Sequence, residues 1–222
     1  MKEMRELWTR VEHWVDTQPA LPPSEAVFGP PARAAQIEAA EQAVGRIFSE
    51  SFRASLLVHD GQFVPGTGRR SEDEIEWVRW LPNQMVLLPL RDILATWREE
   101  RAFEAENASA VEGISEETAD DDRVRAFPTV THAGRLPIAG QEASAYMYLD
   151  FVPDPAGALG QVILTKNECD FSVAGEDFQD FLARYVDLLE RGVLRYDADT
   201  YHSVIPADPR VAFDSLIELR VV

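Results

Sequence analysis

The sequence predicts an α+β fold in which a mixed, mainly antiparallel sheet is flanked by N-terminal helices and by a C-terminal helix. Apolar residues recur at helical spacing early in the chain, alternate at strand spacing over residues 145–151, and return to helical spacing over residues 176–191. An order of helices, then strands, then a helix favours this class over a parallel α/β fold, in which strands and helices alternate.

Three helices are expected before the first strand. Residues 4–16 carry an apolar stripe between charged positions, and residues 32–44 carry a second stripe that stops at Gly45, a residue suited to the left-handed turn after a helix. Ser49 can cap a third helix. The segment 18–31 contains five prolines, which predicts a connector without regular structure.

The middle of the chain is predicted to contain a loop, a strand and a helix. Residues 62–70 include proline and glycines and should form the loop, whereas residues 84–88 resemble a buried strand. Helical spacing begins at Leu90 and ends in a highly charged stretch. Residues 104–123 contain eight acidic side chains and one basic side chain, so mutual repulsion predicts a mobile loop there.

The second half should begin with a hairpin whose strands are residues 145–151 and 161–164. Alternation on its first strand places Tyr146, Tyr148 and Asp150 on one face and Met147, Leu149 and Phe151 on the other. The helix that follows should end at Gly192. The apolar residues of 211–222 fit neither period, so this segment is expected to be either a strand or a short helix.

We expect residues 1–222 to form one domain with its core at about 8–195, an acidic insertion at about 104–123, and a C-terminal extension at 196–222. A chain of 222 residues can bury a sizeable core without disulfide or metal cross-links.

The charge of the chain bears on its partners. There are 39 acidic and 21 basic side chains, a net charge of −18, which disfavours binding to nucleic acid or to an anionic membrane and favours a basic protein partner. The first residues lack the apolar core of a secretion signal, and no uncharged stretch exceeds 11 residues. The single Cys169 and four scattered histidines form no metal-binding pattern, so we expect a cytoplasmic protein without metal or cofactor.

Catalytic motifs are weak. Ser55, His59 and Asp60 suggest nucleophilic catalysis, but neighbours on a helix point about 100° apart, so Asp60 is poorly placed to orient His59. A helix C-terminus is the favoured interpretation of this segment. Residues 66–70 lack the ending of a phosphate-binding loop, and the acids around Cys169 disfavour a reactive thiolate. No catalytic residue is predicted, and we expect the chain not to be an enzyme.

Two acidic segments are candidate partner-binding surfaces. Aromatic anchors with a negative rim suit a protein interface, and the first segment combines Glu72, Asp73, Glu74, Glu76, Trp77 and Trp80. The alternative for both tryptophans is a place in the core. The second segment contributes Glu112, Glu116, Glu117, Asp120, Asp121 and Asp122, and its alternative is a merely solvated insertion.

Several segments, taken in order, resemble the SUKH superfamily, which includes fungal cell-wall-assembly regulators of the Smi/Knr type and bacterial toxin-immunity proteins. They are residues 8–14, 35–41, 51–62, 87–97, 136–139, 148–155, 160–163 and 181–192. The positions that match family motifs, with an expected structural role, are His59, Asp60, Gly61, Gln62, Asp150, Pro153, Gly160 and Gln161.

The resemblance implies an α+β fold and a function in binding. The expected function is that of an immunity protein that neutralises a cognate toxin, a nuclease or another polymorphic toxin, by direct binding to a basic toxin domain. The alternative is a housekeeping adaptor in cell-wall or signalling regulation. The oligomeric state stays open.

Overall fold

The computed structural model describes residues 1–62, 79–81, 85–111, 121–127, 131–141, 145–166, 170–199 and 203–217. Its helices in these ranges are α1 (Lys2–Asp16), α2 (Ser24–Val27), α3 (Ala34–Val44), α4 (Glu50–Leu56), α5 (Leu90–Val111), α6 (Phe178–Glu190) and α7 (Phe213–Ile217). The strands are β1 (Val86–Leu87), β2 (Arg135–Gln141), β3 (Ala145–Asp150), β4 (Gln161–Lys166), β5 (Asp170–Gly175), β6 (Leu194–Asp197) and β7 (Ser203–Pro206). This mixture of elements confirms the predicted α+β class.

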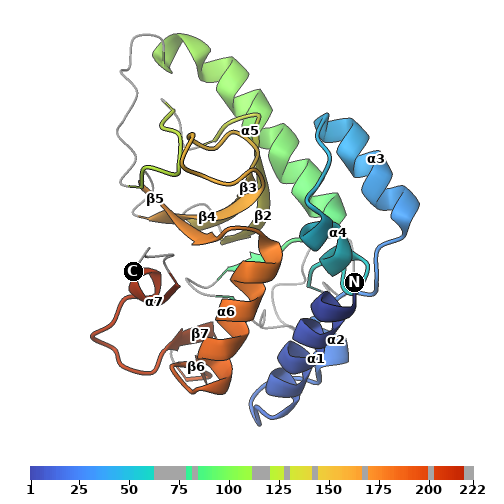
Figure 1. Cartoon of the computed structure of the whole chain (residues 1–222), viewed down its shortest axis with the longest axis vertical. Helices are drawn as coiled ribbons and strands as arrows, with labels where there is room; N and C mark the ends of the chain where they lie inside the picture. The colour runs from blue at the N-terminus through green and yellow to red at the C-terminus, as the bar shows by residue number, and fades with distance from the viewer. Residues whose placement is uncertain are drawn as a thin grey trace.

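Five strands form an antiparallel sheet in the order β1-β2-β3-β4-β5, so each strand pairs with its neighbour in sequence. In the central hairpin, Tyr148 lies opposite Ile163 and Asp150 lies opposite Gln161. Strands β6 and β7 form a separate antiparallel pair. Figure 1 shows the five-stranded sheet between α5 and α6, which contact its strands.

The helix ends follow from local sequence. Gly45 and Gly192 follow α3 and α6 with φ angles of 70° and 67°, in the left-handed region that glycine adopts without strain. The Ser49 side chain accepts a hydrogen bond of 3.3 Å from the backbone nitrogen of Phe52 and caps α4. These three predicted helix boundaries are confirmed.

The first and last long helices pack against each other. The buried residues of α1 recur every three or four positions and are Met4, Leu7, Trp8, Val11, Trp14 and Val15. This stripe packs on α6, beside which α1 lies in Figure 1. At the solvent edge of the contact, the Nη2 atom of Arg10 lies 2.6 Å from Oε2 of Glu190.

Both faces of the sheet are buried. Met147 and Leu149 point into the main core, whereas Tyr148 belongs to a second, smaller cluster on the opposite face. The other members of that cluster are Val124, Ile163, Phe171 and Val173. The predicted alternation is therefore confirmed for residues 147–149, and neither face of β3 is left to solvent.

Trp80 lies in the core. It is 1% exposed, and its ring lies 5.2 Å from Phe28, 5.7 Å from Trp8 and 5.4 Å from Tyr185, measured between ring centroids. Its backbone oxygen also accepts a hydrogen bond from the hydroxyl of Tyr185. The prediction of Trp80 as a surface anchor for a partner is wrong, because aromatic rings from distant parts of the chain enclose it.

Two segments are more regular than the sequence predicted. The proline-rich connector contains the single helical turn α2. Helix α5 continues to Val111, past the point where a loop was expected, because Glu104 pairs with Arg101 one turn earlier at 2.7 Å. Repulsion among acids is thus relieved locally by a base at helical spacing.

Strand β5 and the β6–β7 pair were not among the sequence predictions, and β6 and β7 have only four residues each. Helix α7 decides the open alternative for the C-terminal segment in favour of a short helix. The predicted loop at 62–70 lies outside the described residues except for Gln62.

Substituting Trp80→Ala should lower the free energy of unfolding by about 3–5 kcal/mol, because it removes a fully buried ring and leaves a cavity. Urea unfolding monitored by circular dichroism measures this loss. The matched control is Phe103→Ala, whose ring is 61% exposed and whose loss should change stability by about 0.5 kcal/mol or less. Equal effects of the two substitutions would contradict the placement of Trp80 in the core.

Candidate interaction surface

The motif residues 59–62 join the N-terminal helices to the sheet. The two ring nitrogens of His59 both face acceptors: Nδ1 lies 2.9 Å from the backbone oxygen of Gly29, and Nε2 lies 2.8 Å from Oε1 of Glu12. Asp60 accepts a hydrogen bond of 2.7 Å from the backbone nitrogen of Leu90, the first residue of α5. Burial raises the pKa of Asp60, although the hydrogen bond from Leu90 opposes the shift.

Gln62 completes this junction. Its side-chain oxygen accepts a hydrogen bond of 2.8 Å from the backbone nitrogen of Leu87, and its own backbone nitrogen donates to the oxygen of Leu87 at 2.9 Å. One residue therefore satisfies both backbone groups of Leu87, so the end of β1 is paired without a further strand.

Gly61 allows its own backbone to approach the backbone of Leu88 and Pro89 closely. Its φ angle is 68°, and a β-carbon at this position would lie 2.4 Å from the nitrogen of Pro89. Its backbone oxygen accepts from Gly29 at 2.9 Å. No side chain fits here, which explains why this segment requires glycine.

These contacts also bear on the weak catalytic motif. The hydroxyl of Ser55 accepts a hydrogen bond of 3.0 Å from the indole nitrogen of Trp8, whereas His59 and Asp60 bond to other groups. The three side chains are thus not arranged as a nucleophile, a base and an orienting acid. The described residues contain no group of three or more His, Cys, Asp or Glu side chains able to hold a metal ion.

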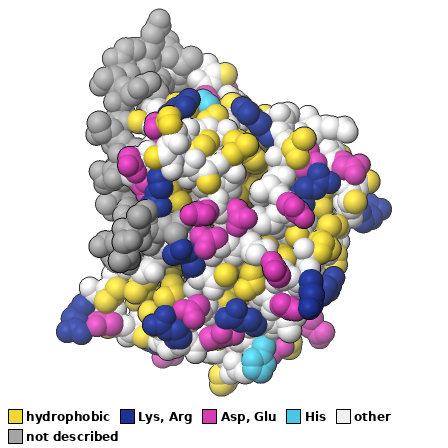
Figure 2. All heavy atoms as spheres, viewed as in Figure 1, with side chains coloured by type: hydrophobic (Ala, Val, Ile, Leu, Met, Phe, Trp, Pro, Cys, Tyr) yellow, Lys and Arg dark blue, Asp and Glu magenta, His cyan; other side chains and the backbone are white. Residues whose placement is uncertain are grey.

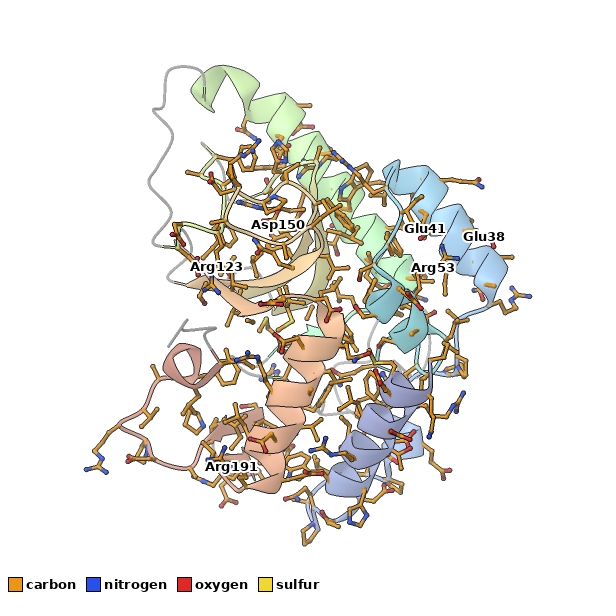
Figure 3. All side chains as sticks on the ribbon, in the orientation of Figure 1. Glu38, Glu41, Arg53, Arg123, Asp150 and Arg191 are labelled. Atoms are coloured by element: carbon orange, nitrogen blue, oxygen red, sulfur yellow. The ribbon has the colours of Figure 1, made fainter. Side chains whose placement is uncertain are left out.

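A second polar junction lies at the base of the β3–β4 hairpin. Asp150 is fully buried and accepts hydrogen bonds from the Gln161 side chain at 3.1 Å and from the Val152 nitrogen at 3.0 Å. Gln161 also donates to the backbone oxygen of Arg123 at 2.9 Å. Burial raises the pKa of Asp150, opposed by these hydrogen bonds and by the charge of Arg135, its partner on β2. Figure 3 shows Asp150 and Arg123 in the part of the molecule that contains the sheet.

The turn of this hairpin contains two further motif positions. Gly160 has a φ angle of 82°, and its nitrogen donates to the backbone oxygen of Asp150 at 2.7 Å. Pro153 is half-buried in the same turn, where a β-carbon on Gly157 would lie 2.9 Å from its side chain. All eight motif positions therefore lie at one of the two polar junctions.

Most of the acidic residues predicted to bind a partner are not among those that the structure describes, so a common surface formed by them stays a prediction. Glu72, Asp73, Glu74, Glu76, Trp77, Glu112, Glu116, Glu117 and Asp120 lie outside the described residues. Burial alone would raise the pKa of Asp121, but hydrogen bonds from Arg123, whose guanidinium lies 2.6 Å away, lower it. Of the described members, only Asp122 is exposed.

A buried carboxyl on α5 has no counterpart among the sequence predictions. Glu100 is 8% exposed and accepts a hydrogen bond of 3.0 Å from the hydroxyl of Tyr148. Burial raises the pKa of Glu100 to about 7, although Tyr148 and Arg101 act in the opposite direction. No sequence pattern identifies this residue, since it lies among several exposed acids of the same helix.

A cluster of positive charge around His132 likewise has no counterpart among the sequence predictions. The His132 ring stacks on Phe127 with centroids 3.8 Å apart. Burial, together with the charges of Arg135, Arg101, Arg46 and Arg125, lowers the pKa of His132 to about 4. The imidazole is therefore neutral at neutral pH and adjoins several arginines.

The fold and its two polar junctions define an α+β domain of the SUKH type. The chain belongs to the SMI1 / KNR4 family (SUKH-1), whose sequence signature matches residues 31–184. The predicted family resemblance is thereby confirmed.

A curated relative agrees with this assignment. The chain is 27% identical over 206 residues to the cell wall biosynthesis/cell cycle regulator smi1 of Schizosaccharomyces pombe. The similarity covers 87% of this chain and 38% of the yeast protein, so the chain spans well under half the length of that relative.

Replacing Gly61 by alanine should destabilise the fold by several kcal/mol, because the β-carbon would clash with backbone that cannot move away alone. Gly192→Ala is the matched control, since Gly192 has a φ angle of 67° and open space around it. The control should lose only about 1–2 kcal/mol from left-handed backbone strain. Thermal and urea unfolding measure both; similar losses would contradict a role for close approach at Gly61.

Glu100 should make stability depend on pH. A carboxyl whose pKa is raised in the folded state contributes its full stability below its ordinary pKa of 4.5, where it is protonated in both the folded and the unfolded protein. That contribution is lost as pH rises through the folded-state pKa of about 7. Between about pH 5 and pH 8 the native protein should therefore lose about 3 kcal/mol relative to Glu100→Gln, which cannot ionise. Urea unfolding at the two pH values measures the difference.

The control for this experiment is Glu99→Gln, an exposed neighbour on the same helix. It should follow the native protein at both pH values. Parallel pH dependence of the native protein and Glu100→Gln would show that Glu100 ionises normally.

Proposed function

We propose that this chain is a non-catalytic protein-binding domain that neutralises a cognate toxin, a nuclease or another polymorphic toxin, by direct binding. Membership of the SMI1 / KNR4 family is the observation that carries the proposal. The net charge of −18 supports it, because a basic toxin domain would be attracted and steered to the complex. The proposal places the protein in the cytoplasm of the cell that makes the toxin.

The internal pairing of polar side chains supports a binding role without catalysis. Ser55, His59 and Asp60 each bond to structural groups, and the buried Asp150 is occupied by Gln161 and Val152. Nucleic acid and membrane are not among the proposed partners. Within the described residues, no helix is both long and apolar enough to cross a membrane.

A second candidate function is a regulatory adaptor in cell-wall or signalling control. The similarity to a yeast protein described as a cell wall biosynthesis/cell cycle regulator favours it, since it covers most of this chain. Both candidates act by occupying a protein partner and differ in what that partner is.

The discriminating experiment is capture of partners from the source cell with a tagged full chain at low salt. A basic toxin domain recovered in equal amount, together with rescue of cells that make this toxin, would support neutralisation. Recovery of cell-wall enzymes or kinases without rescue would favour the adaptor. Recovery of neither class would count against both.

Association with the captured toxin should slow as salt rises, because charge steering is screened when the Debye length falls to ~3 Å at 1 M salt. We expect the association rate constant to drop by roughly tenfold or more between low and high salt, while the dissociation rate constant changes less. Stopped-flow or surface plasmon resonance measures both constants. A salt-independent association rate would remove the support that net charge gives the proposal.

A further inference from the structure

Most arginines of this acidic chain are paired. Within the described residues, ion pairs with acidic side chains are made by Arg10, Arg53, Arg91, Arg101, Arg123, Arg184, Arg191, Arg195 and Arg210. Arg46 and Arg125 are exposed, and neither pairs with an acidic side chain of the described structure; the same holds for Arg5 and Arg98. Arg46 and Arg125 differ from those two because both act on the same histidine, His132.

These two arginines belong to one region of the molecule. Both lie close enough to His132 for their charges to act on it, and so do Arg101 and Arg135. The four arginines come from the loop after α3, from α5, from the segment before β2 and from the first residue of β2. The fold therefore concentrates positive charge that is dispersed along the sequence.

Hydrogen-bond donors are also in excess here. Arg101 uses its Nη2 atom in the ion pair with Glu104, 2.7 Å away, whereas its Nε and Nη1 atoms have no acceptor among the described residues. The indole nitrogen of Trp97, one turn earlier on α5, is buried without an acceptor in the same part of the structure. These donor atoms are buried, so they add to the positive potential beneath the surface and do not themselves contact a surface ligand.

Apolar side chains are exposed next to this charge. Ile47 is 78% exposed and Leu159 is 72% exposed. Their loops touch, because a β-carbon on Gly160 would lie 3.5 Å from the β-carbon of Ser49. Figure 2 shows hydrophobic side chains close to basic side chains and a histidine on one part of the face in view.

The loop that carries Ile47 is held in place. Glu41 accepts hydrogen bonds from the backbone nitrogen of Phe48 at 2.8 Å and from the Arg53 guanidinium at 3.0 Å. Figure 3 shows Glu41 and Arg53 between α3 and α4. Phe48 is thereby buried while its neighbour Ile47 stays in solvent, so the exposure of Ile47 comes from an ordered loop.

We infer that this hairpin-tip surface, defined by Arg46, Ile47, Arg125, His132 and Leu159, binds an acidic peptide segment of a protein partner that also carries apolar side chains. The inference rests on the proposed function as a protein-binding domain. Carboxylates of the segment would accept hydrogen bonds from the arginines, and its apolar side chains would cover Ile47 and Leu159.

The net charge of −18 on the whole chain does not prevent an acidic peptide segment from binding in direct contact with these arginines. At physiological salt the Debye length is about 8 Å, so arginines in direct contact outweigh acids farther away. Nucleic acid is a poorer fit, because a long phosphate backbone would extend over the acidic remainder of the surface and would not use the exposed leucine and isoleucine. A partner can thus be basic where it meets acidic regions and acidic where it meets this surface.

The test uses a fluorescein-labelled peptide of glutamates interrupted by leucines, and a matched peptide with lysine in place of glutamate. Fluorescence anisotropy at low salt should show binding of the glutamate peptide alone. Amide shifts in NMR spectra should concentrate in residues 45–49, 121–135 and 151–160. The double variant Arg46→Gln with Arg125→Gln should weaken binding by about tenfold or more.

Two further variants separate local contacts from net charge. Arg5→Gln with Arg191→Gln removes the same number of charges from exposed positions on α1 and after α6, and it should bind the glutamate peptide as the native protein does. Ile47→Ser with Leu159→Ser should also weaken binding. Both altered residues are exposed, so circular dichroism should show an unchanged fold.

The inference is overturned if the glutamate peptide does not bind, if both arginine doubles bind it equally, or if single-stranded DNA of equal charge binds this surface more tightly. Repeating partner capture with Arg46→Gln and Arg125→Gln separates this inference from the proposed function. Undiminished capture would overturn the hairpin-tip surface and leave the proposed function standing, whereas diminished capture of a partner with an acidic segment supports both.

Discussion

The close approach of the backbone at Gly61 to Leu88 and Pro89 is the constraint on which the relation between the helices and the sheet depends. A turn without a side chain brings Asp60 to the first amide of α5 and Gln62 to the end of β1. The direction of α5 is therefore set by residues that follow α4. Because α5 carries Glu100, the turn at Gly61 also helps to place the carboxyl that bonds to Tyr148 on the other face of the sheet.

The two faces of the sheet are buried by different means. The α6 side is an apolar core with an aromatic cluster, in which Trp8 and Trp80 are nearly inaccessible. The opposite face combines a small apolar cluster with buried polar groups, among them Glu100 and Asp150. The raised pKa of these carboxyls and the lowered pKa of His132 share one leading cause, since removal from water disfavours each charged form.

The sequence could predict elements whose pattern is local. Helices α1, α3, α4 and α6 follow from apolar spacing and from caps such as Ser49 and Gly192. The family motifs also identified residues of both polar junctions, although not the residues to which they bond. The predictions that were wrong or absent depend on distant residues. Trp80 is flanked by an acidic sequence, yet Phe28 and Tyr185 bury it. The charge around His132 comes from arginines that are up to 89 positions apart, between Arg46 and Arg135, so no window of sequence contains them. Glu100 is likewise buried next to Tyr148, which lies 48 positions farther along the chain on β3.

The packing of α1 on α6 joins two helices that are far apart in the sequence. Arg10 and Glu190 are separated by 180 positions, and Gln179 likewise bonds to Glu3. Contacts between such distant segments form late and slow the folding of a chain. During synthesis on the ribosome, α1 would present its apolar stripe for as long as α6 has not emerged, so Trp8 and its neighbours are exposed to other hydrophobic surfaces in that interval. The charged residues between the apolar positions of α1 would keep its other face solvated during that interval.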